Sequence, residues 1–335
     1  MSALDLIRRR VAVDIDQLSP EIAERLGPFC DMTSNQALVA AVVTNPENEV
    51  VVRRIVARAR IEGKGEEEQI ELALDLFAVT FAKAVLPFLN GRVHAQLSPR
   101  YAHSVPDSLA HAHRLKSLFA AEGIPPSRWC LKIPCTGAGL VAAKQLESEG
   151  IRTLATTLFS VDQALAASQA GCLYIAPYWN ELSVHFEPET WRDYETPEKE
   201  HPMSEVIRKI VDVYKGIEPR PLIMPASIVT SKEALAISTL GVDHITISGA
   251  VLEALAADQY AQEFRGAALD VDVPAARVPE GGKTVHPNVD FLTNNGAALD
   301  ESIGADESVK RRLNYAIKAF ADCEARAVEV IRSLL

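Results

Sequence analysis

Eight strand-like runs alternate with helix-like stretches along the chain, and this alternation restricts the fold more than any other feature. Each run is short and apolar, as buried strands are. Strands separated by helices pair in parallel, because the helix returns the chain to the edge from which the previous strand started. The strands are predicted at residues 11–15, 29–33, 92–97, 129–136, 153–158, 172–176, 221–227 and 243–248.

Eight strand–helix units match a (β/α)8 TIM barrel, whose typical length of about 250 residues grows with insertions. We therefore predict an α/β protein in which residues 1–335 form a single (β/α)8 barrel domain with extra N-terminal and C-terminal helices. A C-terminal helix over about 305–335 is expected to pack on the barrel, and residues 185–203 and 270–302 are expected to be loops. After a short first helix, further helices are predicted at residues 36–62, 66–86, 105–122, 138–149, 160–170, 203–215 and 231–239.

An open doubly wound sheet is the alternative fold, and a nucleotide-binding glycine motif would support it. No G-x-G-x-x-G follows the first predicted strand. The run Gly137-Ala138-Gly139 lacks the third glycine and the later acidic partner. We expect no cofactor.

The charge and cysteine content exclude several classes of protein. A net charge of −11 and a pI near 5.3 argue against nucleic acid or an anionic membrane as the main partner, because both require a basic surface. No apolar run approaches the roughly 18 residues of a membrane span, and no signal peptide is recognisable, so a cytoplasmic protein is expected. The five cysteines are odd in number and scattered, which favours reduced thiols and no structural metal.

Lys132 stands inside the apolar run of residues 129–136. Side chains alternate along a strand, so Lys132 and Cys130 share one face while Leu131 and Ile133 share the other. A desolvated ammonium loses its proton more easily than one in water, and the neutral amine attacks a ketone to form a Schiff base. The alternative is a lysine on an edge strand whose amine reaches solvent.

Polar residues recur where the predicted strands end, and barrel enzymes carry their chemistry at that end. An amine, a carboxylate and several hydrogen-bonding groups would converge on one cavity. Asp14 and Asn35 have an alternative role as helix caps or turn formers. The residues of this set are Asp14, Asn35, Gln96, Lys132, Thr156 and Ser227.

The chain resembles the transaldolase family over nearly its whole length. The matching segments are residues 31–38 (family D-A-T-T-N-P-S-L), 91–100 (G-R-V-S-T-E-V-D-A-R), 131–136 (I-K-L-A-S-T), 156–164 (T-L-L-F-S-F-A-Q-A) and 243–248 (D-x-L-T-I-S). The resemblance implies a (β/α)8 barrel in which Lys132 is the Schiff-base nucleophile and Asp14 the general acid/base. It also implies a small-molecule ketone donor and an aldehyde acceptor as partners, and it is compatible with a homodimer.

Four departures from the transaldolase pattern resemble the fructose-6-phosphate aldolase branch of the same superfamily. Gln96, Leu154, Ala176 and Tyr178 stand where transaldolases have glutamate, asparagine, serine and phenylalanine. That branch performs free aldol addition and cleavage. The resemblance implies that Gln96, Thr156 and Tyr178 are catalytic. It also implies a substrate-binding set of Thr33, Asn35, Leu154, Ala176, Glu181 and Ser227.

The phosphate-binding positions depart further. Glu181 and Val229 stand where the family has two arginines, and Ser227 alone remains. Because arginine is the usual bidentate partner of phosphate, a non-phosphorylated or otherwise atypical carbonyl substrate is expected, with Glu181 as the partner of a cationic group. The sequence thus predicts a transaldolase-like Schiff-base aldolase. The alternatives are an ordinary transaldolase of the pentose phosphate pathway and a catalytically inactive barrel that binds a metabolite or a protein.

Overall fold

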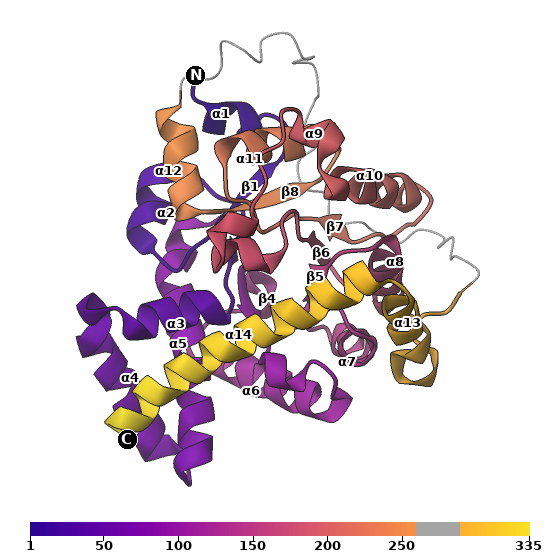
Figure 1. The fold of residues 1–335 in the computed structure, drawn as a ribbon. Helices are drawn as coiled ribbons and strands as arrows, with labels where there is room; N and C mark the ends of the chain where they lie inside the picture. The colour runs from indigo at the N-terminus through magenta and orange to yellow at the C-terminus, as the bar shows by residue number, and fades with distance from the viewer. Residues whose placement is uncertain (259–288) are drawn as a thin grey trace.

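A closed barrel of eight parallel strands forms the centre of the molecule (Figure 1). The computed structural model describes residues 1–258 and 289–335. Seven neighbouring pairs follow the order β7-β6-β5-β4-β3-β2-β1-β8. Backbone hydrogen bonds from Asp243 to Ile223 and from Thr246 to Pro225 join the two remaining edges. The strands are β1 (Ala12–Asp16), β2 (Met32–Thr33), β3 (Val93–Gln96), β4 (Trp129–Pro134), β5 (Thr153–Leu158), β6 (Tyr174–Pro177), β7 (Leu222–Ile223) and β8 (His244–Ser248).

Helices surround the barrel, and the predicted (β/α)8 architecture is confirmed. None of the helices in the described ranges is long and apolar enough to cross a membrane. The helices are α1 (Ala3–Arg8), α2 (Pro20–Leu26), α3 (Gln36–Thr44), α4 (Glu49–Glu62), α5 (Glu66–Val85), α6 (Val105–Ala121), α7 (Gly137–Ser148), α8 (Val161–Ala170), α9 (Pro197–Glu200), α10 (Pro202–Tyr214), α11 (Ser231–Ile237), α12 (Gly249–Ala257), α13 (Thr293–Ala305) and α14 (Glu307–Leu334).

Polar residues that follow the strands start the helices. Thr136 follows β4, and its hydroxyl accepts a hydrogen bond from the Gly139 N–H at the start of α7. Ser160 caps α8 in the same way after β5. Such caps satisfy backbone donors that lack partners within the helix, so each strand passes directly into a helix.

Several predicted segments differ from the structure. The helix expected over residues 36–62 is divided into α3 and α4 at Asn45, because Pro46 has no N–H to continue the helix. Of the loop expected over residues 270–302, the part up to 288 lies outside the described residues, and residues 293–302 belong to α13. The sequence pattern also missed α2 and α12, and it missed α9, which lies inside the loop expected over residues 185–203.

The start of α13 explains why its sequence resembles a loop. Asn294, Asn295 and Gly296 have left-handed backbone angles there, with φ of 50°, 58° and 82°. Gly296 packs directly on Gly137 of α7, and a Cβ on Gly137 would lie 2.4 Å from the Gly296 carbonyl oxygen. The Gly137 N–H donates to Asp300 Oδ1 at 2.8 Å. Glycine at both positions therefore allows α13 to attach to the helix that follows β4.

The C-terminal helix α14 runs diagonally across the barrel and α3 in the view of Figure 1. Phe320 of this helix is buried and reaches the cavity that contains Lys132. The C-terminal end of α14 lies near α4 and α5. The helix therefore covers one side of the barrel mouth.

Candidate active site

A cavity of about 250 Å³ opens at the carboxyl ends of the strands, and Lys132 lies in its wall. The residues beside it come from distant parts of the sequence, because every strand of a barrel ends at the same rim. Its polar lining consists of Asp16, Gln17, Asn35, Lys132, Tyr178, His185, Ser227, Thr246 and Ser248.

Lys132 is 2% exposed, on β4. In the strand register it lies between Gln96 of β3 and Leu154 of β5. Burial lowers the pKa of the Lys132 amine, and the Asp16 carboxylate opposes this shift by favouring the ammonium form. A larger share of neutral amine is available than on an exposed lysine, as attack on a carbonyl requires.

Asp16 supplies the carboxylate of the cavity. It ends β1, and its Oδ1 accepts a hydrogen bond of 2.6 Å from the Thr33 hydroxyl. The Thr33 oxygen lies 2.6 Å from the Thr246 hydroxyl, so two threonines fix the carboxylate in place. The sequence prediction missed Asp16 and Thr246.

Asp14, the residue predicted as the acid/base group, lies deeper in the barrel and does not line this cavity. Its Oδ1 accepts from the Asp31 N–H at 2.8 Å, and its Oδ2 lies 2.9 Å from His244 Nδ1. Burial opposes the charge on His244, but the carboxylates of Asp14 and Asp31 outweigh it and raise the pKa of His244. The acid/base role does not fit this position, and Asp16 replaces Asp14 as the candidate.

The buried pair also has a sulfur neighbour. Potential ligand atoms of Asp14, Cys30 and His244 lie within 4.8 Å of one another. His244 Nδ1 is already committed to Asp14, and burial raises the pKa of the Cys30 thiol. The arrangement is that of a structural ion pair beside a protonated thiol.

Tyr178 lines the cavity, and its hydroxyl accepts a hydrogen bond of 3.2 Å from Thr156. Burial raises the pKa of Tyr178 well above its ordinary value, so the phenol stays protonated near neutral pH. Thr156 is fully buried and contacts the cavity through Tyr178. These two predicted catalytic residues are therefore brought together.

Gln96 lies beside Lys132 in the register, but its amide turns toward a different space. Its nitrogen donates to Gln36 Oε1 at 2.6 Å, and its own Oε1 has no hydrogen-bond partner within the described residues. The side chain borders a small cavity of about 30 Å³ beneath α14. That volume holds one water molecule, which would complete the Gln96 hydrogen bonds.

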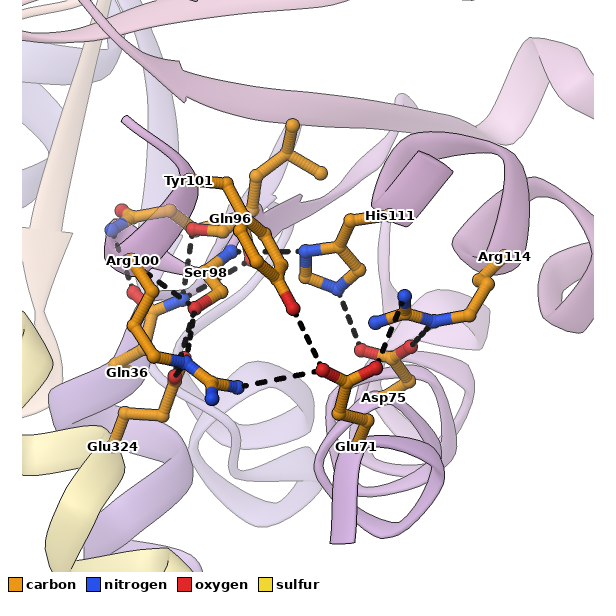
Figure 2. A network of polar contacts seen from close by, with 11 residues as sticks. Gln36, Glu71, Asp75, Gln96, Ser98, Arg100, Tyr101, His111, Arg114 and Glu324 are labelled. Atoms are coloured by element: carbon orange, nitrogen blue, oxygen red, sulfur yellow. Dashed lines mark hydrogen bonds and ion pairs between the residues drawn. The ribbon is translucent and has the colours of Figure 1, made fainter. Parts of the chain in front are cut away.

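A polar network attaches α14 to the barrel next to Gln96 (Figure 2). Buried Glu324 of α14 accepts from the Ser98 hydroxyl and from Arg100 Nε, each at 2.8 Å. The Ser98 N–H donates to His111 Nδ1 at 3.1 Å. The network continues from His111 through Asp75, Arg114, Glu71 and Tyr101. Residues after β3 are thereby held against α5, α6 and α14.

The predicted substrate-binding residues occupy different places. Asn35 lines the cavity, but its side-chain oxygen also caps α3 by accepting from the N–H groups of Ala37 and Leu38. Thr33 holds Asp16, as described above. Leu154 and Ala176 are buried apolar residues of β5 and β6.

Ser227 lies in the cavity wall with a left-handed backbone (φ 62°), and its hydroxyl lies 3.0 Å from His185 Nε2. Burial lowers the pKa of His185, while the Asp16 carboxylate opposes the shift. His185 ends a short 3₁₀ helix, Leu182–His185, and is the first residue of the segment that was predicted as a loop. No sequence pattern identified it.

Glu181 does not face the cavity. Arg311 of α14 binds its carboxylate with both guanidinium nitrogens, at 2.6 and 2.7 Å, and Arg312 approaches to 3.6 Å. The expectation that Glu181 receives a cationic substrate group is corrected accordingly, because the protein itself supplies that cation. No arginine lines the cavity within the part of the chain that the structure describes.

Comparison with known proteins gives a consistent result. Residues 13–322 match the family described as Transaldolase/Fructose-6-phosphate aldolase. A transaldolase of Schizosaccharomyces pombe is 33% identical over 225 residues, covering 67% of this chain and 69% of its own. A transaldolase of Nostoc sp. is 28% identical over 335 residues, covering 99% and 95%, and one of Chromohalobacter salexigens is 26% identical over the full length of both chains. The chain folds into a (β/α)8 barrel with a buried lysine in its mouth, and the family match extends over residues 13–322. The protein therefore belongs to the transaldolase/fructose-6-phosphate aldolase family.

Proposed function

We propose that the protein makes and breaks carbon–carbon bonds through a Schiff base on Lys132, with Asp16 as the acid/base group and an unphosphorylated carbonyl compound as the acceptor. The observation that carries this proposal is a lysine, buried by the barrel, that shares a cavity with one carboxylate. Desolvation provides the neutral amine, and the carboxylate provides a place for the proton.

The reaction begins when the neutral Lys132 amine adds to the carbonyl carbon of a ketone donor. The carbonyl oxygen takes up two protons, one of them from the attacking nitrogen, and leaves the carbinolamine as water, which gives the protonated imine. Asp16 then removes a proton from the neighbouring carbon, which leaves an enamine. Its carbon attacks the aldehyde acceptor, whose oxygen is protonated as the new bond forms. Hydrolysis of the product imine returns the amine of Lys132.

Tyr178 is proposed to donate a hydrogen bond or proton to oxygen in these steps. Its raised pKa keeps the phenol protonated, and Thr156 fixes the position of its oxygen. Gln96 is proposed to act through an ordered water, because its side chain borders a water-sized cavity and its Oε1 has no hydrogen-bond partner within the described residues. Gln96 and Tyr178 are the residues found at these positions in the fructose-6-phosphate aldolase branch. This resemblance favours free aldol addition and cleavage.

The charges around the cavity support an unphosphorylated acceptor. Bidentate arginine is the usual partner of phosphate, and Lys132 is the one basic side chain besides His185 in the described lining. The lowered pKa of His185 makes it a neutral partner for a hydroxyl group. Ser227 and His185 together would therefore hold hydroxyls of an uncharged substrate.

Ordinary transaldolase activity is the second candidate, and the names of the similar proteins favour it. The two activities differ in the fate of the donor. A transaldolase retains the dihydroxyacetone unit until a second aldehyde accepts it, whereas an aldolase releases dihydroxyacetone. Release of free dihydroxyacetone when no acceptor aldehyde is present would indicate an aldolase, and retention of the dihydroxyacetone unit would indicate a transaldolase.

Borohydride reduction in the presence of dihydroxyacetone tests the proposal directly. Peptide mass analysis should find the reduced adduct on Lys132, and Lys132→Met should lose it while keeping a side chain of similar length. An adduct on another lysine, or none with dihydroxyacetone or hydroxyacetone, would point to an inactive barrel.

A further inference from the structure

Glu324 of α14 places a buried carboxylate beside Gln96. Each of the two side chains is 6% exposed, and both line the small cavity of about 30 Å³ beneath α14, which we call the Gln96 cavity. They belong to the polar network of Figure 2, in which Glu324 reaches the barrel from the last helix of the chain. Gln96 itself is uncharged, where transaldolases have glutamate. The cavity therefore brings a carboxylate next to a position that has none.

The orientation of the Gln96 carboxamide is determined by Gln36. Gln36 Nε2 donates to the carbonyl oxygens of Gln96 and Leu97, at 3.3 and 3.0 Å. Gln36 Oε1 is therefore free to accept from Gln96 Nε2, at 2.6 Å. This arrangement leaves Gln96 Oε1 buried and without a hydrogen-bond partner among the described residues. A buried carbonyl oxygen requires a donor, and the adjoining Gln96 cavity has room for one water.

Most other polar groups around the Gln96 cavity already have partners. His111 Nδ1 accepts from the Ser98 N–H, and His111 Nε2 lies 2.7 Å from Asp75 Oδ1. The second oxygen of Asp75 accepts from an arginine of α6. Glu324 uses its Oε1 for the two hydrogen bonds described above, whereas its Oε2 has no hydrogen bond to the part of the chain that the structure describes. A water in this cavity therefore has a second acceptor in Glu324 Oε2.

Asn35 connects the Gln96 cavity to the Lys132 cavity, because it lines both. Its Oδ1 accepts from the N–H groups of Ala37 and Leu38, at 2.9 and 3.1 Å, which fixes that oxygen at the start of α3. Its Nδ2 forms no hydrogen bond within the described ranges. The two hydrogens on Nδ2 are therefore available to a water in one cavity and to a substrate hydroxyl in the other.

We propose that Glu324 is a positioning residue for the reaction at Lys132, and that it acts through one water bound by Glu324 Oε2, Gln96 Oε1 and Asn35 Nδ2. The inference rests on the proposed function, because it takes the reaction to occur at Lys132. The water donates to the two oxygens and accepts from Asn35, which gives the three hydrogen bonds usual for a buried water. The second N–H of Asn35 then binds a hydroxyl of the ketone donor.

A double-mutant cycle tests the link between Glu324 and Gln96. With dihydroxyacetone and glyceraldehyde as substrates, Glu324→Gln should lower kcat about tenfold, because an amide N–H donates where the carboxylate accepts and one hydrogen of the water loses its acceptor. The new side chain keeps an oxygen for Ser98 and Arg100. In the Gln96→Leu background the same substitution should change kcat by less than about twofold, because the water has already lost Gln96. A tenfold effect in both backgrounds would overturn the proposal.

Glu71→Gln is the matched control. Glu71 of α5 belongs to the same network, where it accepts from the Tyr101 hydroxyl at 2.7 Å and lies 3.2 Å from Arg114, but it does not line the Gln96 cavity. Its effect on kcat should be the same in the wild-type and Gln96→Leu backgrounds. If Glu71→Gln shows the coupling expected of Glu324→Gln, the coupling reflects the attachment of α14 and the proposal fails.

The water itself can be observed directly. A high-resolution crystal structure should show it within hydrogen-bonding distance of Gln96 Oε1, Glu324 Oε2 and Asn35 Nδ2. A cavity without a water, or a water that does not contact Glu324, would overturn the proposal.

Imine trapping separates this inference from the proposed function. Glu324 does not line the Lys132 cavity, so Glu324→Gln should still form the borohydride-reduced adduct of dihydroxyacetone on Lys132. If the wild type forms the adduct but Glu324→Gln has the wild-type kcat, the role of Glu324 alone fails. If the wild type forms no adduct, the proposed function itself fails.

Discussion

The Asp16 carboxylate and the Lys132 amine line one cavity. The carboxylate shifts the pKa of Lys132 in the direction opposite to the shift caused by burial. Burial lowers the pKa of Lys132, while Asp16 raises it. The lysine therefore lies between two effects, one that favours the nucleophilic neutral amine and one that favours the ammonium. Asp14, two residues earlier on the same face of β1, is absent from the lining of that cavity.

Replacing the two aspartates separately should distinguish their roles. Asp16→Asn keeps size and hydrogen bonding but removes the base, so kcat should fall about 10²–10⁴-fold, the usual worth of a positioned acid/base group. Asp14→Asn should affect stability more than proton transfer. Steady-state kinetics together with urea unfolding measure both effects. A larger loss of kcat in Asp14→Asn than in Asp16→Asn, at equal stability, would restore the role first assigned to Asp14.

The pH dependence of imine formation should report the lowered pKa of Lys132. The rate of borohydride trapping is expected to rise with pH and to level off below the ordinary lysine value of about 10.4. Asp16→Asn should move this profile to still lower pH, because a carboxylate stabilises the ammonium and its removal takes that stabilisation away. A shift to higher pH, or none, would show that Asp16 does not act on Lys132.

Val229→Arg should create a preference for phosphorylated acceptors. An arginine at this position restores one of the two that the family pattern places here, and a charge-assisted hydrogen bond is worth about 1.5–3 kcal/mol, or roughly 10–100-fold. The measurement is the ratio of kcat/KM for erythrose 4-phosphate to that for erythrose. Glu181→Arg is a poorer test, because it would break the ion pair with Arg311.

Val229→Met is the matched control, since it adds bulk without charge and should leave the ratio near its wild-type value. A wild-type enzyme that already prefers the phosphorylated aldehyde would contradict the proposed substrate and favour ordinary transaldolase activity.

The buried pair of Asp14 and His244 should make stability fall as pH rises above neutrality. Burial opposes the charge on His244, but its carboxylate neighbours raise its pKa to about 9, above the unfolded value of about 6.5. A raised pKa contributes stability that is fully present below about pH 6.5 and is lost as the pH passes through about 9. The loss is on the order of 3 kcal/mol.

Urea unfolding between pH 6.5 and 9 measures this slope in wild type and in His244→Gln, which should flatten it. His94 is the control, because it also pairs with a buried aspartate but burial lowers its pKa. His94→Gln should keep the slope. Equal slopes in wild type and His244→Gln would show that His244 is not protonated in the folded protein.

The sequence alone predicted the barrel and the buried lysine on its fourth strand. Strand and helix periodicities are local properties of the chain, and eight alternations of them leave few ways to bury every apolar face. Lys132 stood out because a charge inside an apolar strand must be either functional or at an edge. The same local reasoning placed Thr156 at the end of a strand, and the family resemblance added Tyr178, to which the structure joins Thr156 by a hydrogen bond.

Only the tertiary structure decided how deep each side chain lies and which distant groups neutralise it. Asp14 and Asp16 share a face of β1, but the register pairs Asp14 with Thr246 and Asp16 with Ser248, which places Asp16 nearer the open end. Glu181 looked free in the sequence, yet Arg311, 130 residues away, binds it. Depth in a barrel depends on register, and charge pairing depends on contacts between remote segments. Neither leaves a periodic signal in the chain.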